Sequence, residues 1–348
     1  MANKLEKANP GSRLKRDDFD AALVPGFRAA TRGEYQALAG AWQSTAAGSL
    51  QEDGRFHAEA LRTRDCPLCA TSRGTATPLF SKLGMDIVKC AGCGLTYSAT
   101  ILAPEYDRML YVRSDSQASY INLKRNEAYA AIERIKCRYL VQRLGDYAQP
   151  GSLLDVGPGS GRLMEAANAA GWRSLGVEAN AEFVVSCRKR GLDVVEGFFP
   201  DCPAGDEKFD AIAMLDVVEH LAEPVEFLRN GIRRLRAGGV LVLQVPNVQS
   251  LLVQLEGARN SNFCHGHWNH FDPATLVRLA ASAGLEPLAV ETIISEIDRI
   301  LAFPRPEIAR AARLIAGVVP PAVLDTNWLH THGMGYKVVG FFRIAAHG

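Results

Sequence analysis

The sequence predicts an α/β fold in which helices cover both faces of a parallel sheet, with a small metal-binding unit in front of it. Apolar runs typical of buried strands alternate with helical patterns between Gly151 and Asn247, which indicates strand–helix–strand units. A glycine-rich loop joins the first apolar run to the first helical pattern, as in nucleotide-binding α/β proteins. Two C-x-x-C pairs precede this region.

Length and charge limit the class of protein. The chain has 348 residues, enough for two or three domains, and its 39 basic and 38 acidic residues give a net charge of +1. This balance gives no indication of nucleic acid or an anionic membrane as the main partner. The first residues lack the apolar core of a signal peptide, and no apolar run is long enough to cross a bilayer. We therefore expect a cytoplasmic protein whose cysteines bind metal or lie buried.

Four regions follow one another in the predicted organisation. Residues 1–64 are expected to form an N-terminal extension that is partly disordered or helical. Residues 65–103 form the metal-binding unit, and residues 104–146 form a helical linker or lid. Residues 147–348 form the α/β domain with the glycine-rich loop.

The metal-binding unit is predicted from Cys66 and Cys69, followed twenty residues later by Cys90 and Cys93. Four thiolates at this spacing can bind one tetrahedral zinc ion. Because four protein ligands leave no open coordination position, zinc would have a structural role in a zinc ribbon. Four buried free cysteines are the alternative. A redox pair is disfavoured, because neither C-x-x-C begins a helix of a thioredoxin-like unit.

The glycine-rich loop follows Asp155 and has glycines at alternate positions, Gly157, Gly159 and Gly161. Glycine lets the backbone approach a ligand and turn where a Cβ would clash, and the helix that follows presents unpaired N–H groups. A dinucleotide fingerprint would need a small residue where this chain has Arg162. The spacing therefore disfavours NAD, and an NAD-dependent oxidoreductase ranks third among the functions considered.

The acid-x-G-x-G-x-G pattern resembles the first motif of the class I S-adenosylmethionine-dependent methyltransferases, and the double C-x-x-C resembles that of members with an N-terminal zinc ribbon. The resemblance implies a Rossmann-like methyltransferase sheet of seven strands, the last of them antiparallel, and S-adenosylmethionine as the cofactor. Strands are expected at residues 153–156, 174–178, 193–196, 210–215, 240–245, 288–294 and 337–344.

Further cofactor contacts are expected where the later strands end. Glu178 ends the second strand about twenty residues after the glycine loop, where an acid can accept both ribose hydroxyl hydrogens. Alternatively, its negative charge interacts favourably with the dipole at the start of the next helix. Many family members carry an aspartate near Phe198 that binds the adenine amine; since this chain lacks it, backbone contacts and ring stacking are expected there. Asp216, which follows the fourth strand, is a second-choice cofactor contact.

Three histidines are candidates for acid–base catalysis. His220 lies in a segment that resembles the family's D-x-x-E-H element, beside the methionine part of the cofactor, and a structural hydrogen-bonded role is equally compatible. His267 and His270 lie in the loop from Cys264 to Pro273, which resembles a loop that borders the substrate pocket of zinc-ribbon methyltransferases. Catalysis or substrate binding, capping of the loop, and a second metal site all remain open for this loop.

Two further segments are candidates for the pocket wall. In related methyltransferases the segment before the first strand folds over the cofactor, so one of Tyr106, Tyr111 and Tyr120 is a candidate to face the sulfonium or the substrate. Residues 305–324 form a predicted helical insertion that ends at a Pro-Pro pair, and this insertion is expected to line the pocket or to mediate a homodimer contact.

The resemblance implies methyl transfer to a small-molecule acceptor, by O- or C-methylation of a sugar, a sugar nucleotide or a specialised-metabolite precursor. Methylation of a quinone-type or phenolic ring is the alternative among enzymes. From another class, the chain would be a non-catalytic zinc-ribbon interaction protein that binds the cofactor, but the intact glycines and Glu178 argue against a decayed site. The fourth strand is not followed by N/D-P-P-Y/F, an element of amino-group methyltransferases of DNA and protein.

Overall fold

The computed structural model describes residues 12–47, 57–104, 106–107, 115–201 and 207–345. Within these ranges, no helix combines the length and the apolar composition needed to cross a membrane. Tyr111, one of the three candidate tyrosines, lies outside the described residues.

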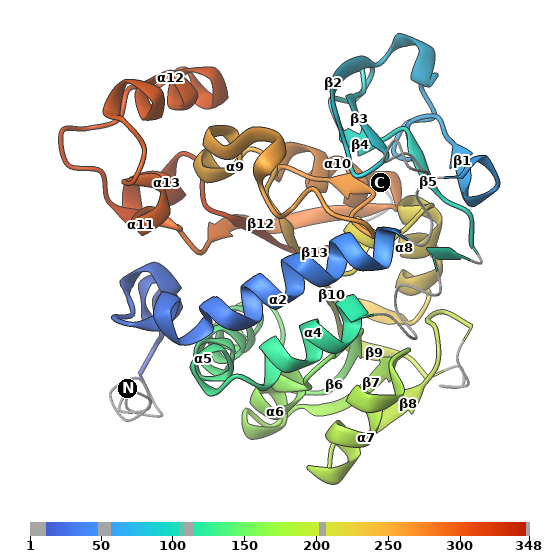
Figure 1. The fold of residues 1–348 in the computed structure, drawn as a ribbon. Helices are drawn as coiled ribbons and strands as arrows, with labels where there is room; N and C mark the ends of the chain where they lie inside the picture. Colours follow the sequence, from blue (N-terminus) through green and yellow to red (C-terminus); the bar gives the residue numbers. More distant parts are fainter. Residues whose placement is uncertain (1–11, 48–56, 105, 108–114, 202–206, 346–348) are drawn as a thin grey trace.

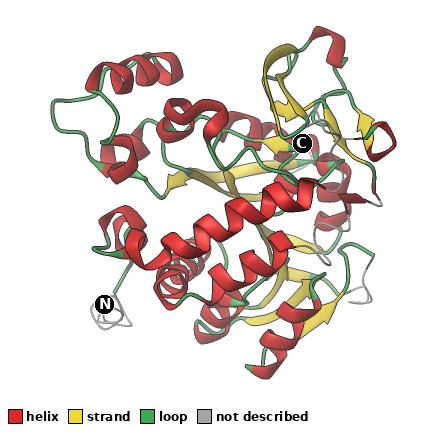
Figure 2. Ribbon diagram, in the orientation of Figure 1, coloured by secondary structure: helices red, strands yellow, loops and turns green. Residues whose placement is uncertain are grey.

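A seven-stranded sheet lies at the centre of the molecule, with helices on either side (Figures 1 and 2). Its strands follow the order β12–β13–β10–β9–β6–β7–β8. Neighbours from β10 to β8 are parallel, whereas β13 is antiparallel to both β10 and β12. The strands are β6 (Ser152–Val156), β7 (Arg173–Glu178), β8 (Val194–Glu196), β9 (Phe209–Leu215), β10 (Leu235–Pro246), β12 (Leu285–Ile293) and β13 (Lys337–Ile344). The predicted Rossmann-like sheet with an antiparallel last strand is confirmed.

The largest difference from the predicted strands is at β10. It begins at Leu235 rather than at residue 240, because Leu235 already pairs with Phe209 and the register then shifts before Val240. Gly238, with φ of +77°, lies within this irregular stretch. A glycine in the left-handed region lets the chain bend without leaving the sheet.

The central strands are apolar because both faces of the sheet are covered. All five residues of β6 are buried. Helices α5 (Glu127–Leu144) and α6 (Arg162–Ala169) pack on one face, and α8 (Pro224–Ile232) and α10 (Pro273–Ser282) pack on the other. The strand order reverses between β6 and β9, so their carboxyl ends mark the place where open α/β sheets bind ligands.

The N-terminal extension adds a long helix to the helical layer. Helix α2 (Phe27–Ala47) packs along α4 (Asp115–Arg125) and also contacts α5, as Figure 1 shows. The buried Phe27 and Phe19 join the apolar cluster that α5 forms on the sheet. The four domain boundaries stay predictions.

The predicted zinc ribbon contains a small antiparallel sheet of β2 (Thr77–Lys82), β3 (Met85–Lys89) and β4 (Thr96–Ser98). Its fourth strand, β11 (Asn269–His270), comes from the histidine loop and pairs with β4. Two further short strands, β1 (Leu61–Thr63) and β5 (Thr100–Leu102), pair with each other beside it. The ribbon and the histidine loop therefore share one sheet.

The predicted insertion near the C-terminus contains α12 (Arg305–Ala316), which is followed by the C-cap residue Gly317 and then by the Pro-Pro pair. It packs with the short helices α9 (Leu251–Glu256), α11 (Ile297–Ile300) and α13 (Thr326–Thr331) around a separate apolar cluster. These helices lie together at one end of the molecule (Figure 1).

Candidate functional site

The glycine loop joins the carboxyl end of β6 to the first turn of α6, and its three glycines all have positive φ. They serve different needs. A Cβ at Gly161 would lie 2.6 Å from Leu192 Cδ1 and 2.9 Å from Cys187 Sγ, so this glycine lets the loop pack against its neighbours. A Cβ at Gly159 would meet nothing within 4 Å. The loop therefore borders open space at Gly159, where a ligand can approach the backbone.

Two buried carboxyl groups lie beside this opening. Glu178 accepts hydrogen bonds from the backbone N–H of Gly159 at 2.9 Å and of Asn180 at 2.8 Å. Asp155 is 2% exposed, and its Oδ2 has no hydrogen-bond partner among the described residues. Burial raises the pKa of both groups, and the nearby Glu178 helps to raise the pKa of Asp155 to about 8. Such acceptors suit the hydroxyl and amino groups of a ligand.

Phe198 follows β8 and is 41% exposed. Aromatic rings stack on flat ligands, and this ring lies at the carboxyl edge of the sheet. Arg162, the residue that disfavours a dinucleotide, extends from the start of α6 to Glu165, with 2.8 Å between Nη1 and Oε2.

Asp216 follows β9 directly and has φ of +58°, a strained value for a residue with a Cβ. Lys337 Nζ lies 2.6 Å from its Oδ1, and Gln244 Nε2 donates to its Oδ2 at 3.1 Å. Burial alone would raise the pKa of Asp216, but the charge of Lys337 outweighs it and lowers this pKa. The structure thus places the second-choice cofactor contact in an ion pair.

The structure brings two of the three candidate histidines together. The rings of His220 and His267 lie edge to face with centroids 4.7 Å apart. His270 lies in β11 against the ribbon, with its ring 4.7 Å from that of Phe263. Burial lowers the pKa of all three, to about 4 for His220 and to about 3 for His270, so the three imidazoles are neutral at pH 7.

Hydrogen bonds to carbonyl groups define the tautomer of the histidine pair. His220 Nδ1 lies 2.7 Å from the carbonyl oxygen of Gly266, and His267 Nδ1 lies 3.0 Å from that of Asn262. Since a carbonyl oxygen only accepts, Nδ1 carries the proton in each ring and Nε2 carries the lone pair. Both histidines can therefore accept a proton or bind a cation through Nε2.

Glu219 is a site residue that the sequence analysis missed. Its side chain is 1% exposed, and neither carboxylate oxygen has a hydrogen-bond partner among the described residues. Burial, and then the charge of Asp216, raises the pKa of this carboxyl group. The sequence feature that could have indicated Glu219 is its position before His220 in the D-x-x-E-H segment.

A buried group of charges on the helical layer was also missed. Glu133 lies 2.7 Å from Lys136 Nζ and 3.5 Å from Lys124 Nζ, and Lys124 donates to the hydroxyl of Tyr129 at 3.1 Å. Burial opposes ionisation, but the two lysines lower the pKa of Glu133 to about 2. Their charges also help to lower the pKa of Asp216, so this group of charges acts on the same site from the α5 side.

The four ribbon cysteines lie together and are free thiols. Their Sγ atoms all lie within 4.8 Å of one another, with 3.5 Å between Cys66 and Cys93 and between Cys69 and Cys90. Zn–S bonds of about 2.3 Å place tetrahedral sulfurs roughly 3.8 Å apart. The four thiols therefore fit one zinc ion, as predicted.

Arg64 connects the ribbon to the histidine loop, and the sequence analysis did not single it out. Its guanidinium donates to the carbonyl groups of Ser98 on β4, Ala222 beyond His220, and Trp268 in the loop, at 3.0, 2.9 and 2.7 Å. It also donates to Asn269 Oδ1 at 2.9 Å. Burial lowers the pKa of Arg64 to about 10, which still leaves it charged at pH 7.

The two described candidate tyrosines lie apart. Tyr106 packs on an apolar cluster that includes Met85 of the ribbon and Trp268 of the histidine loop. Tyr120 on α4 lies edge to face with Phe183 of α7 (Ala181–Lys189), with ring centroids 6.3 Å apart.

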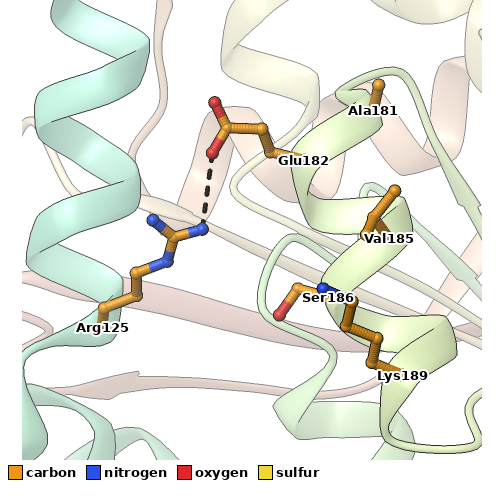
Figure 3. Close-up of a pocket in the computed structure, with 6 residues that line it drawn as sticks. All are labelled: Arg125, Ala181, Glu182, Val185, Ser186 and Lys189. Atoms are coloured by element: carbon orange, nitrogen blue, oxygen red, sulfur yellow. Dashed lines mark hydrogen bonds and ion pairs between the residues drawn. The ribbon is translucent and has the colours of Figure 1, made fainter.

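A surface hollow of about 430 Å³ lies between the end of α4 and the outer side of α7 (Figure 3). Arg125 reaches from α4 across this hollow to Glu182, with 3.4 Å between Nη2 and Oε2. The hollow is lined by Arg125, Ala181, Glu182, Val185, Ser186 and Lys189. None of the candidate cofactor residues or histidines lines it.

Residues 129–290 match the family model described as "Methyltransferase domain". The matched region begins in α5, contains the glycine loop, both buried carboxyl groups and the histidine loop, and ends in β12. Over these residues the chain is similar to methyltransferase domains, and its seven-stranded sheet has the Rossmann-like methyltransferase fold. The cysteine ribbon and α12 lie outside the matched residues of that domain.

The methyltransferase domain has distant relatives. An uncharacterized protein of Methanocaldococcus jannaschii is 25% identical over 163 residues, which cover 46% of this chain and 77% of that protein. A ubiquinone biosynthesis O-methyltransferase of Idiomarina loihiensis is 26% identical, over 41% of this chain and 64% of that protein. The chain spans 58% and 56% of the length of two other relatives. The solved structure of 1,6-didemethyltoxoflavin-N1-methyltransferase from Burkholderia thailandensis is 18% identical with a TM-score of 0.46, covering 78% of this chain and all of that chain.

Proposed function

We propose that the chain transfers a methyl group from S-adenosylmethionine to a small-molecule acceptor. The observation that carries this proposal is the open space at Gly159 beside two buried carboxyl groups, within a methyltransferase domain. Glu178 would accept the ribose hydroxyl hydrogens, and the exposed Phe198 would stack on the adenine. Asp155, whose Oδ2 has no partner among the described residues, would accept a hydrogen bond from the bound cofactor.

The main requirement of the reaction is that the protein aligns the acceptor with the cofactor. The bound cofactor supplies a methyl group already activated by its positive sulfur. The chain would hold the acceptor in line with the S–CH₃ bond and exclude water, and such alignment contributes on the order of 7–11 kcal/mol at best. A hydroxyl or acidic carbon must also lose a proton, for which His220, His267 and His270 are the candidates. The first two are favoured, because their rings are paired after the end of β9.

We propose a structural role for zinc in the ribbon. Cys66, Cys69, Cys90 and Cys93 would provide four thiolates and leave no coordination position for a substrate. The metal would then hold β3 and β4, and through β4 it would hold the strand β11 of the histidine loop.

The acceptor proposed first is a sugar, a sugar nucleotide or a specialised-metabolite precursor, methylated on oxygen or carbon. A quinone-type or phenolic ring is the second candidate, and a specific observation favours it. Several relatives of the methyltransferase domain are ubiquinone biosynthesis O-methyltransferases, with identities of 26–31% over 27–41% of this chain.

A homodimer contact through the inserted helices is a further proposal. Leu314, Val319 and Val323 are 78%, 59% and 80% exposed, and an apolar surface of this kind is suited to association. Sedimentation equilibrium of the wild-type protein and of a Leu314→Glu variant tests it.

Calorimetric titration with S-adenosylmethionine, S-adenosylhomocysteine and NAD tests the proposed function, with zinc quantified in the same sample. We expect roughly micromolar binding of both adenosyl ligands, no binding of NAD, and one zinc per chain. Binding of NAD alone would make the chain an oxidoreductase. Cofactor binding without turnover on any sugar or ring acceptor would favour the non-catalytic interaction protein.

Glu178→Ala sharpens this test, with Glu182→Ala as the matched control. Hydrogen bonds to a charged group contribute about 1.5–3 kcal/mol each, so the first variant should bind the adenosyl ligands at least tenfold more weakly. Glu182 is 62% exposed and pairs with Arg125 in the hollow of Figure 3. An exposed ion pair of this kind contributes little to the free energy of unfolding. Equal affinities for the two variants would place the ribose elsewhere.

A further inference from the structure

Three side chains with metal-binding atoms lie together after the end of β9. They are Glu219, His220 and His267, and one ligand atom from each lies within 4.8 Å of the others. Val217, two residues before Glu219, lies against the glycine loop, because a Cβ at Gly157 would be 3.2 Å from Val217 Cγ2. The cluster is therefore next to the proposed cofactor site and belongs to its acceptor side.

The two histidines of this cluster make the Nδ1 hydrogen bonds that are common in metal-binding histidines. Each donates its Nδ1 proton to a backbone carbonyl group, of Gly266 for His220 and of Asn262 for His267. Metal-binding histidines commonly donate their other ring N–H to a carbonyl or carboxylate, which fixes the tautomer and directs the lone pair at the ion. Here both lone pairs lie on Nε2.

Within the described part of the chain, no hydrogen bond compensates for the burial of the Glu219 carboxylate. Glu219 is 1% exposed and neither of its oxygens has a hydrogen-bond partner there. Burying a carboxyl group without partners is unfavourable, and buried charges are ordinarily paired or bound to metals. Lys337, whose charge acts on Glu219, is already paired with Asp216 at 2.6 Å. A cation between Glu219 and the two imidazoles would satisfy this group.

We propose that Glu219, His220 and His267 bind one divalent transition-metal ion, such as Mn²⁺, Fe²⁺ or Co²⁺. Imidazole ligands favour these ions over Mg²⁺ and Ca²⁺, which prefer oxygen ligands alone. Three protein ligands leave positions open, and on the proposed function these would take oxygen atoms of the acceptor.

The other mixed cluster of acids and histidine in the described residues does not share these features. It consists of Asp17, Asp20 and His330. Asp17 is exposed, and both oxygens of Asp20 accept backbone N–H groups, from Ala22 and Ser295. Since its buried carboxylate is already satisfied, this cluster provides a control for the proposed site.

The test is a titration of zinc-loaded protein with Mn²⁺, followed by electron paramagnetic resonance, and with Co²⁺, followed by visible absorption. The thiolates are already occupied by zinc, and a Co²⁺ spectrum without thiolate charge-transfer bands would identify nitrogen and oxygen ligands. We expect one additional ion per chain. Glu219→Gln and His267→Ala should weaken its binding by more than the 10–100-fold that loss of an outer-shell partner costs. His330→Gln should leave the affinity unchanged.

The proposal is overturned if neither ion binds, if both ligand variants bind as wild type does, or if His330→Gln alone abolishes binding. Titration of the same samples with S-adenosylmethionine separates this result from the proposed function. Cofactor binding without metal binding rejects the metal site alone. Metal binding without cofactor binding rejects the proposed methyl transfer and keeps the site. Glu219→Gln preserves the size of the side chain, so it covers the case in which His267→Ala fails to fold.

Discussion

The cofactor side and the acceptor side of the methyltransferase domain are built in different ways. The proposed cofactor residues from Asp155 to Glu178 lie within one strand–helix–strand unit, and the backbone of Gly159 bonds directly to Glu178. On the acceptor side, Glu219 follows β9, whereas His267 comes from a loop almost fifty residues further along the chain. That loop is held by a third segment, the cysteine ribbon, through β11 and β4.

This difference indicates that the ribbon supports the proposed acceptor side. The carbonyl group of Trp268 accepts from Ser98 N at 2.9 Å and from Arg64, while Trp268 N donates to the carbonyl group of Glu219 at 2.9 Å. The ribbon, the histidine loop and the segment after β9 are thus linked by hydrogen bonds. The cofactor side has its own support in the sheet, so damage to the ribbon should separate the two sides.

The largest effect should follow removal of the proposed zinc, by chelation or by Cys66→Ser. Structural zinc contributes about 10–16 kcal/mol to the folding of small metal sites, far more than the ribbon's few strands can replace. We expect amide hydrogen exchange to accelerate in the ribbon and also at Trp268 and in β11, while calorimetric binding of S-adenosylmethionine is retained.

Cys137→Ala is the control for this experiment, because Cys137 is a buried thiol of α5 outside the cysteine cluster. It should leave exchange in the histidine loop as in wild type. Loss of cofactor binding together with the ribbon would show that the two sides are not separable.

A smaller effect is expected for Arg64→Lys. Lysine keeps the charge but cannot reach Ser98, Ala222 and Trp268 together, and a displacement of about 1 Å in a reacting group can cost roughly 100-fold in rate. We expect faster exchange in the histidine loop, with unchanged cofactor affinity. The exposed Arg62 on β1 gives the matched variant Arg62→Lys. If both variants exchange alike, Arg64 is not what positions the loop.

The same contrast explains how much could be predicted from the sequence. The individual strands, the glycine loop, Glu178 and each C-x-x-C pair are encoded in short sequence patterns, since each depends on residues close together in one element or turn. Strand positions were correct to within a few residues, except at β10, where a register shift extends the strand to Leu235.

The acceptor side depends on contacts between distant segments, which no local pattern encodes. The pairing of β11 with β4 and the role of Arg64 arise only in the folded chain. The charges of α5 were missed for another reason. Glu133 and Lys136 lie on the buried side of a helix whose apolar spacing predicts a core, and their mutual pairing makes burial possible.

Within the cofactor side, two glycines that look alike in the sequence should respond differently. Gly161→Ala places a Cβ 2.6 Å from the buried Leu192 at φ +70°, and overpacking with a left-handed backbone should cost roughly 2–4 kcal/mol in the free energy of unfolding. Gly159→Ala meets no atom within 4 Å and should cost about 1–2 kcal/mol, for its φ of +51° alone. Its Cβ would instead enter the space proposed for the cofactor.

Urea unfolding and calorimetry of the two variants measure both quantities. We expect Gly161→Ala to lose more stability and Gly159→Ala to lose more affinity for S-adenosylmethionine. The reverse order for affinity would place the ligand away from Gly159.

The last prediction concerns the pH dependence of stability. Burial, with Glu178 nearby, raises the pKa of Asp155 from 3.8 to about 8, so between these values the folded chain holds a proton that the unfolded chain releases. The stability from this group is therefore complete below about pH 4 and is lost as pH rises toward 8, by up to about 1.4 kcal/mol per pH unit. Asp155→Asn should flatten this part of the profile of unfolding free energy, measured without cofactor. Asp193→Asn, which removes an exposed carboxylate beside β8, should leave the slope as in wild type. A wild-type slope in Asp155→Asn would mean that this carboxyl group is ionised in the folded protein, beside the carboxyl group of Glu178.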